Sequence, residues 1–392
     1  CATQSYGVIP KKLYSYKTVE VISGDLNSFK LVKKDNFVIS LRSFEGGIEH
    51  SNYQGIISPA YTILEPQVEI YSFYFKFLFK SSFFISTLNI HKIGIREGQN
   101  ISYASLQYTP IPLPPLQKQK EIAEFLDSKC EKIQNYIDKK QKLITLLQEK
   151  KQALINEAVT KGLNPNIESK NSGIEYLGLI PHHWEVKKLK ILFSLGNGLN
   201  ITKQDFVSYG IPCVSYGEIH SKYPCRLDTS IHKLPYVSET YLADKPQSLL
   251  TKGDFVFADT SEDIEGSGNF TSIQSYVPVF AGYHTIILKP KTSEINDLYF
   301  SFLFDSFGIR SQIRKEVCGV KVFSITKSIL KEIQCLLPPL QEQKEIAEFL
   351  DKKCEKINSV IEKTKKQIEL IKEYKNTLIN EAVCGRINLE RK

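Results

Sequence analysis

Two long stretches of the chain place apolar residues at steps of four and three, the spacing of a helix that packs along one face. The first stretch runs through Leu126, Cys130, Ile133, Ile137, Ile144, Leu147 and Leu154. The second runs through Leu350, Cys354, Ile357, Ile361, Ile368, Ile371 and Leu378. Lys140 and Lys151 interrupt the first stripe, and Thr364 and Lys375 interrupt the second. The pattern predicts two long helices, each with a stripe that pairs with another helix.

The two predicted helices are copies of one another. Residues 114–127 read PPLQKQKEIAEFLD and return 224 positions later as PPLQEQKEIAEFLD, and the register continues to Asn164 and Asn388. The first helix leads into a globular segment and the second leads out of it, so pairing requires an antiparallel arrangement. At 1.5 Å per residue, about 44 residues form a rod of roughly 65 Å. The alternative is that the two are independent surface helices.

The segments beside the helices have another character. Aromatic and β-branched runs separated by turns predict a mixed α/β (α+β) domain between the helices. Segments of the first 113 residues match only its later part: YFKFLF at 74–79 parallels YFSFLF at 299–304. We therefore expect a two-fold pseudo-repeat with four parts, 1–113, 114–164, 165–337 and 338–392. By this comparison the first domain lacks about its first fifty residues.

Composition narrows the class only slightly. The formal charge of +8 favours an anionic partner weakly, and ordinary solubilising charge is an equal alternative. The eight cysteines, at 1, 130, 213, 225, 318, 335, 354 and 384, form no CxxC pair, which disfavours zinc and is typical of a reduced cytoplasmic protein. Neither a signal peptide nor a membrane span is predicted.

Candidate catalytic chemistry is weak. His182 and His183 are adjacent, so they point in different directions, and packing or capping is the expected role. The acidic run Asp259, Glu262, Asp263 and Glu265 lacks an EF-hand spacing and is expected to be a solvated loop rather than a cation site. Residues 266–268, GSG, lack the third glycine of a phosphate-binding fingerprint. We find no paired nucleophile and base, and expect a noncatalytic chain without a metal or cofactor of its own.

Polar side chains in turn-rich segments are candidates for DNA contacts. Lysine and arginine suit phosphates and guanine, whereas asparagine and glutamine suit adenine. In the first domain these candidates are Arg42, Ser43, His50, Ser51, Tyr53 and Gln54. In the second they are Asn200, Lys203, Ser215, Tyr216, His220, Lys222, Thr260, Ser261 and Asn269. Taken singly, each is more often an ordinary surface or turn residue.

The chain resembles the specificity subunits of Type I restriction-modification systems over essentially its whole length. The resemblance is carried by the duplicated PPLQxQKEIAxFLD motif, by SGIEYLGLIPHHWEV at 172–186, and by LRSFEGGI at 41–48 with SPAY at 58–61. It implies two target-recognition domains joined by antiparallel coiled-coil helices. Each domain would read one half of a split, asymmetric double-stranded DNA site, with the helices setting the gap. The chain departs from the pattern of this family in its first domain, which is shortened.

The resemblance also implies partners. Two methyltransferase subunits, which use S-adenosylmethionine, and restriction subunits, which use ATP and magnesium, are expected to dock on the chain. Self-association is a further possibility. The alternative function is that of a truncated or silent paralogue, which binds DNA or dimerises without directing modification.

Overall fold

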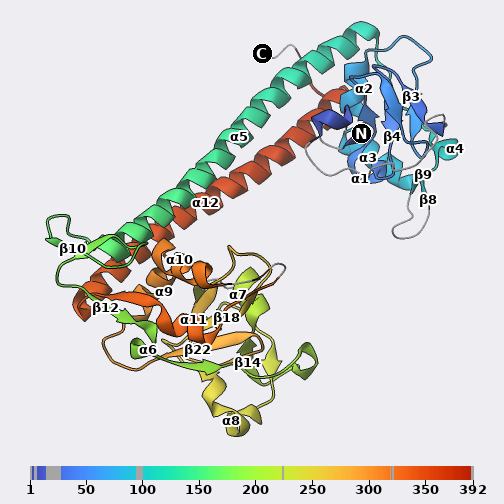
Figure 1. Cartoon of the computed structure of the whole chain (residues 1–392). Coiled ribbons are helices and arrows are strands. Elements are labelled where there is room, and N and C mark those ends of the chain that lie inside the picture. The colour runs from blue at the N-terminus through green and yellow to red at the C-terminus, as the bar shows by residue number, and fades with distance from the viewer. Residues whose placement is uncertain are drawn as a thin grey trace. The chain divides into compact units, whose positions relative to one another are not determined.

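The structure is a computed structural model that describes residues 2–3, 7–14, 28–93, 100–222, 225–317, 319 and 322–389. The chain forms two compact units. Unit 1 contains Cys1–Ile144 and Glu362–Lys392, and unit 2 contains Thr145–Ile361. Figure 1 labels many of the elements of both units. Cys1 and Cys318, two of the eight cysteines, lie outside the described residues.

The predicted helices are present as α5 (Leu116–Lys161) and α12 (Leu340–Val383). Gly162 and Gly385 follow their ends with φ of 74° and 71°, the left-handed conformation in which glycine commonly terminates a helix. Each helix divides between the units. In unit 1 the start of α5 and the end of α12 reach the same globular domain, and in unit 2 the start of α12 and the end of α5 do. The helices are therefore antiparallel within each unit, in agreement with the predicted fold class.

The predicted stripe faces inward along both helices. Its buried members are Leu126, Ile133, Ile137, Ile144, Leu350, Cys354, Ile361, Ile368 and Leu378. Its half-buried members are Cys130, Leu147, Leu154, Ile357 and Ile371. Across the unit 2 part of the pair, Lys151 Nζ donates to Asn358 Oδ1 at 3.1 Å, so one interrupting lysine reaches a partner at the edge of the stripe.

A glutamine of the duplicated motif anchors each domain to a helix. Gln119 Oε1 accepts the Tyr71 N–H at 2.8 Å, and its Nε2 donates to Pro114 O at 2.8 Å. Gln343 does the same with Asn296 N at 3.0 Å and Pro338 O at 2.9 Å. Both side chains are buried. An unpaired buried polar group costs about 1–3 kcal/mol. Glutamine is therefore favoured at this place of the motif, because its amide pairs with both backbone groups.

The far ends of the helices are anchored by a second repeated set of contacts. Tyr74 Oη donates to Val383 O at 3.0 Å in unit 1, as Tyr299 Oη contacts Val159 O at 3.5 Å in unit 2. Asn380 Oδ1 accepts the Phe83 N–H, and Asn156 Oδ1 accepts the Phe307 N–H. Each domain therefore holds the beginning of one helix and the end of the other.

Unit 2 contains two larger sheets, with orders β13-β22-β18-β20-β15 and β16-β14-β21-β17. Their strands are β13 (Phe193–Asn197), β14 (Ile211–Val214), β15 (Cys225–Leu227), β16 (Tyr236–Val237), β17 (Leu249–Leu250), β18 (Phe255–Ala258), β20 (Phe270–Ile273), β21 (Val279–Ala281) and β22 (Thr285–Pro290). The shorter strands are β10 (Ser169–Asn171), β11 (Leu179–Pro181), β12 (Glu185–Lys188), β19 (Thr260–Ser261), β23 (Phe323–Ser324) and β24 (Gln334–Leu337). The helices are α6 (Leu189–Leu192), η4 (Lys203–Asp205), α7 (Tyr216–Ser221), α8 (Tyr241–Asp244), η5 (Pro246–Ser248), α9 (Asp297–Asp305), α10 (Phe307–Glu316) and α11 (Lys327–Glu332).

Successive residues of a strand face opposite sides of the central sheet, so the core of unit 2 is divided into two clusters. Phe255 and Leu288 face a cluster that includes α9 and the helix pair, whereas Val256 and Ile287 face a second cluster with Val214. The central sheet is thus covered by apolar side chains on both faces. The loops at the ends of its strands are not needed to cover these faces and can contact a ligand.

Unit 1 repeats the centre of this arrangement in a smaller form. Its strands are β1 (Ala2–Thr3), β2 (Gly7–Val8), β3 (Lys30–Val32), β4 (Phe37–Ile39), β5 (Glu49–His50), β6 (Gly55–Ile57), β7 (Thr62–Leu64), β8 (Lys92–Ile93) and β9 (Asn100–Ile101). Its helices are η1 (Lys11–Leu13), α1 (Ser43–Gly46), α2 (Ser72–Leu78), α3 (Ser82–Ile90) and α4 (Tyr103–Leu106).

The register of the strands supports the predicted equivalence of the two domains. Phe37 lies opposite Leu64 as Phe255 lies opposite Leu288. The order β5-β4-β7 therefore corresponds to β20-β18-β22. Among the described residues of unit 1, β7 ends the sheet at the edge where β13 continues it in unit 2.

Also within the described residues, no helix combines the length and low polarity that a membrane crossing requires.

Candidate nucleic-acid interface

The predicted polar loops of unit 2 converge because of how its strands pair. Asn197, at the end of β13, lies opposite Ile286, and Ala258, at the end of β18, lies opposite Thr285. Strands β14 and β21 run parallel and finish beside each other at Val214 and Ala281. The loops that follow β13, β14, β18 and β21 are consequently neighbours.

These loops enclose an open groove of about 830 Å³. It is lined by Asn197, Gly198, Leu199, Asn200, Ile201, Thr202, Lys203, Tyr216, Asp259, Gly282, Tyr283, His284 and Thr285. Three predicted residues, Asn200, Lys203 and Tyr216, are thus brought together. Asn200 and Lys203 are exposed and Tyr216 is half-buried. We call this cavity the loop groove.

Aromatic rings form one part of the loop groove. The Tyr216 ring lies 5.6 Å from that of Tyr283 and 5.4 Å from that of His284, both edge-on. Partial burial raises the pKa of Tyr283 above its ordinary value, and the nearby carboxylate of Glu218 adds to this shift. The hydroxyl therefore stays protonated and can donate a hydrogen bond at neutral pH.

His284 was missed as a candidate, although its position is well defined. It has a φ of 55°, and its Nδ1 lies 3.2 Å from Asp259 Oδ1. Its side chain is 57% exposed, so the other ring nitrogen can reach a ligand. The sequence signal was the turn between the apolar runs of β21 and β22, which contains Tyr283 and His284.

Two glycines permit the close approach of the loops. A Cβ on Gly198 would lie 2.0 Å from Gly282 O, and a Cβ on Gly282 would lie 2.1 Å from Ser215 Oγ. Larger residues would push the loop after β13 away from the loop after β21. The width of the loop groove therefore depends on these positions.

A hydrogen-bonded chain supports the adjoining loop. His220 Nε2 lies 2.8 Å from Thr260 O, and its Nδ1 lies 2.9 Å from Asn269 Nδ2. Asn269 Oδ1 accepts from Arg310 Nη1, and Arg310 also pairs with Asp305 at 2.9 Å. With the Asn269 oxygen occupied by Arg310, its amide donates to His220 Nδ1, so the proton of His220 lies on Nε2. Three predicted residues, His220, Thr260 and Asn269, are joined in this network.

The remaining predicted residues of unit 2 divide by exposure. Lys222 follows the end of α7, is exposed, and its Nζ lies 3.9 Å from Glu218 Oε1. Ser215 and Ser261 are buried, and the Ser215 N–H donates to Glu218 Oε2 at 3.2 Å as part of the start of α7. Direct contact with a base is therefore easier for Lys222 than for the two serines, whose position suits support of the loops.

The candidates of unit 1 are split in the same way. Arg42, Tyr53 and Gln54 are exposed, whereas Ser43, His50 and Ser51 are buried. Ser43 Oγ accepts the Ser40 N–H at 2.8 Å, and Ser51 Oγ donates to Tyr53 O at 2.7 Å. Burial lowers the pKa of His50, opposed by Asp35 at 3.1 Å, so the ring is held largely neutral. These three side chains stabilise the domain in the geometry seen here.

The histidines and acidic residues considered above for catalysis or cation binding form hydrogen bonds within the fold. His183 Nε2 lies 2.8 Å from Glu342 Oε2, which also accepts from Trp184 Nε1 at 3.1 Å. Asp263 Oδ1 accepts the Gly266 N–H within the acidic loop. Among the residues that the structure describes, no group of three or more His, Cys, Asp or Glu side chains could hold a metal ion.

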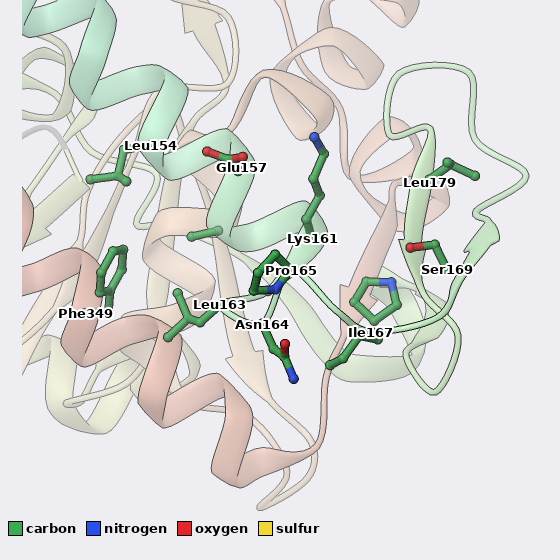
Figure 2. A pocket seen from close by; sticks show the side chains of 13 residues that line it. Leu154, Glu157, Lys161, Leu163, Asn164, Pro165, Ile167, Ser169, Leu179 and Phe349 are labelled. Carbon is green, nitrogen blue, oxygen red and sulfur yellow. The ribbon is translucent and has the colours of Figure 1, made fainter.

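A second cavity in unit 2 has a different character. It measures about 510 Å³ and lies where the end of α5 passes α12; Figure 2 shows Leu154, Leu163, Pro165, Ile167 and Phe349 around it. Glu157 and Lys161 give it one charge of each sign. The loop groove has the same balance, with Lys203 and Asp259, so charge does not separate the two cavities. The loop groove is the better candidate for nucleic acid because it gathers three of the predicted residues, Asn200, Lys203 and Tyr216.

The features described so far define a class of protein: repeated mixed α/β domains, each held by the opposite ends of two long helices. Comparison with known proteins gives the family. Residues 6–147 and 181–370 match the family described as Type I restriction modification DNA specificity domain. The chain belongs to this family.

Individual relatives agree with the match. The chain is 28% identical over 288 residues to the Type I restriction enzyme MjaVIII specificity subunit of Methanocaldococcus jannaschii, covering 71% of this chain and 62% of the relative. It is 25% identical over 291 residues to the EcoKI specificity subunit of Escherichia coli K12, covering 72% and 59%. The chain thus spans less than two thirds of the length of these curated relatives.

Solved structures show the same fold. A chain from work on complex assembly and conformational transition of the type I R-M system has a TM-score of 0.72 at 15% identity, covering 91% of this chain and 84% of that one. The HsdS subunit from Thermoanaerobacter tengcongensis has a TM-score of 0.52 at 16% identity, with 91% and 83% covered.

Proposed function

We propose that this chain is the DNA-sequence-specificity subunit of a Type I restriction-modification complex. The observation that carries the proposal is the loop groove, in which exposed amide and ammonium groups lie beside aromatic rings, in a chain of the specificity-subunit family. The chain would supply recognition and no chemistry of its own. Double-stranded DNA with a bipartite, asymmetric site is the expected ligand.

Within the loop groove the side chains suit distinct tasks. Lys203 can neutralise a phosphate, and Asn200 can form the paired hydrogen bonds that select adenine. Tyr216 and Tyr283 add apolar surface and hydroxyl groups. The network of His220, Asn269 and Arg310 holds the neighbouring loop, so that Thr260 and Lys222 meet the duplex in one geometry. In unit 1, Arg42, Tyr53 and Gln54 are the exposed counterparts.

The complex requires partners that carry out the reaction. We propose that two methyltransferase subunits and the restriction subunits dock on this chain. S-adenosylmethionine, ATP and magnesium would then bind to those subunits. The helices α5 and α12 would set the separation between the two halves of the DNA site.

Methylation mapping tests this function. When this chain is co-expressed with its methyltransferase subunits, we expect adenine methylation at one split DNA sequence throughout the host genome. Long-read sequencing that detects methylated adenine measures it. Cells that lack this chain but retain the methyltransferase are the control. Methylation that is absent, or identical without this chain, would contradict the assignment.

Two substitutions separate phosphate contact from base reading. Lys203→Ala removes one phosphate contact, so we expect weaker binding to all DNA and a salt dependence reduced by about 0.9 in log–log slope. Asn200→Ala should relax discrimination at one base pair by about 1–3 kcal/mol. Fluorescence anisotropy of the assembled methyltransferase on cognate and altered duplexes measures both effects.

Lys245→Ala is the matched control for Lys203→Ala, because Lys245 is exposed and lies outside the loop groove. An equal loss of affinity in both lysine variants would mean that Lys203 acts only through net charge.

A further inference from the structure

The imidazole of His284, which lines the loop groove, has two ring nitrogens in different surroundings. Its Nδ1 lies 3.2 Å from Asp259 Oδ1 and 3.5 Å from Thr260 Oγ1. Within the part of the chain that the structure describes, both hydrogen-bond contacts of this ring are made on the Nδ1 side. The side chain is 57% exposed, so Nε2 is accessible to a ligand in the groove.

The partners of Nδ1 decide where the ring carries its proton. A carboxylate only accepts hydrogen bonds, so the contact with Asp259 requires the proton on Nδ1. Thr260 has a single hydroxyl hydrogen, which it donates to Asp259 Oδ1 at 2.6 Å. Toward Nδ1 the threonine therefore presents only lone pairs, which favours the same tautomer. In the neutral ring Nε2 is then a hydrogen-bond acceptor.

The backbone around this pair holds it in place. The Asp259 N–H donates to His284 O at 3.1 Å, and Asp259 O accepts the Ile325 N–H at 2.7 Å. The Tyr216 ring lies edge-on to the imidazole, with 5.4 Å between the ring centroids. His284 also has a φ of 55°, a left-handed conformation that histidine adopts more readily than most residues. The acceptor is therefore positioned before a ligand enters the groove.

A fixed acceptor selects one kind of base edge. In the major groove, adenine N6 and cytosine N4 are amino donors, whereas guanine O6 and thymine O4 are acceptors. An imidazole acceptor opposite guanine or thymine would bring two lone pairs together without a hydrogen between them, and both groups would lose their bonds to water. Lys203, which also lines the loop groove, presents only donors and cannot select an amino group.

Unit 1 carries different residues at the equivalent positions. The strand register that equates β4 and β7 with β18 and β22 places Leu41 and Ala60 where unit 2 has Asp259 and His284. Neither Leu41 nor Ala60 has a polar side chain, so this pair of positions cannot present a side-chain acceptor in unit 1. The arrangement therefore distinguishes the two domains from each other.

We propose that His284 reads a base, by accepting a hydrogen bond at Nε2 from the exocyclic amino group of adenine or cytosine, and that Asp259 is the residue that positions it. The inference rests on the proposed function, because it requires DNA in the loop groove. It adds the chemical class of the base edge that is read there, and it limits this reading to the half of the DNA site that unit 2 contacts.

Removal of single amino groups from the DNA tests this role. Purine in place of adenine, and 2-pyrimidinone in place of cytosine, delete the amino group at one position at a time in a duplex that carries the mapped site. Fluorescence anisotropy at about pH 8, where a histidine is ordinarily neutral, measures binding by the assembled methyltransferase.

At one position we expect the deletion to weaken binding about fivefold, roughly the effect of one neutral hydrogen bond. With His284→Ala the same deletion should have no such effect. Comparison of the two proteins cancels the effect of the deletion on the duplex itself. The base at the coupled position identifies adenine or cytosine as the one that is read.

Further substitutions separate the acceptor from the bulk of the ring. His284→Gln keeps an acceptor and should retain the dependence on the amino group, whereas His284→Lys presents only donors and should favour guanine or thymine at that position. Asp259→Ala should weaken the dependence, and Asp259→Asn should preserve it, because the amide oxygen can replace Oδ1. His182→Ala is the matched control, since His182 is exposed and lies outside the loop groove.

Three results would overturn the proposal: no position that couples to His284, an unchanged base preference in His284→Lys, or a coupled position outside the half-site that Asn200→Ala affects. Full dependence on the amino group in Asp259→Ala would overturn the role of Asp259. Sequence-specific binding without any coupling to His284 would reject this inference and leave the proposed function standing. If the unaltered chain directs no sequence-specific binding at all, both are rejected.

Discussion

Ile133→Asp should destabilise unit 1 by about 4 kcal/mol or more, because it combines the loss of a buried isoleucine with an unpaired carboxylate inside the helix stripe. Ile133 is 7% exposed and belongs to the part of α5 that lies in unit 1. Denaturant unfolding followed by circular dichroism measures the change. The transition of unit 1 should move to lower denaturant concentration.

Two further variants separate the effect of lost packing from the effect of the added carboxylate. Ile133→Ala removes packing without adding charge, so its loss of stability should be smaller than that of Ile133→Asp. Asn135→Asp adds a carboxylate at an exposed position of the same helix and should change the free energy of unfolding by less than about 0.5 kcal/mol. Unfolding curves that coincide for Ile133→Asp and the unaltered chain would show that the helices do not depend on this stripe.

Insertion of one heptad into both helices should lengthen the gap between the two halves of the recognised DNA site. Seven residues preserve the stripe and extend a helix by about 10.5 Å, which is at most about three base pairs of B-DNA. The insertion points are the unit boundaries, between Ile144 and Thr145 and between Ile361 and Glu362. Methylation mapping of the co-expressed complex measures the gap.

Insertion into α5 alone is the control for this experiment. It shifts one stripe against the other, and methylation should fall because the helices no longer pair in register. The double insertion should restore methylation at a site with a longer gap. An unchanged gap with full methylation would reject a role of the helices in spacing.

The helices could be predicted from the sequence because their signal is local. A stripe with steps of four and three, free of proline and glycine from Leu116 to Lys161, specifies a helix and its buried face together. The role of Gln119 could not be predicted, because its partner Tyr71 lies 48 residues away in the sequence. In the sequence alone, a glutamine whose amide is buried cannot be distinguished from one whose amide is exposed.

The candidate DNA site was predicted only in part, for the same reason. Polarity and turn signals located the loops that hold Asn200, Lys203 and Tyr216. They could not distinguish exposed Lys222 from buried Ser215, since burial depends on β14 and β21 ending together. His284 was overlooked because a single histidine in a short turn carries no pattern. Its left-handed backbone and its contact with Asp259 emerge only from the fold.

The contacts that each domain makes with the end of the other helix have a consequence for the exchange of domains between related genes. A domain cut out at its own sequence boundaries would lose the helix end outside those boundaries that it also contacts, through Asn380 and Val383 in unit 1 or Asn156 and Val159 in unit 2. Recombination at the middle of both helices would instead transplant a unit with both grips intact. The boundary that preserves both units in such an exchange therefore lies in the middle of the helices and not at the ends of the domains.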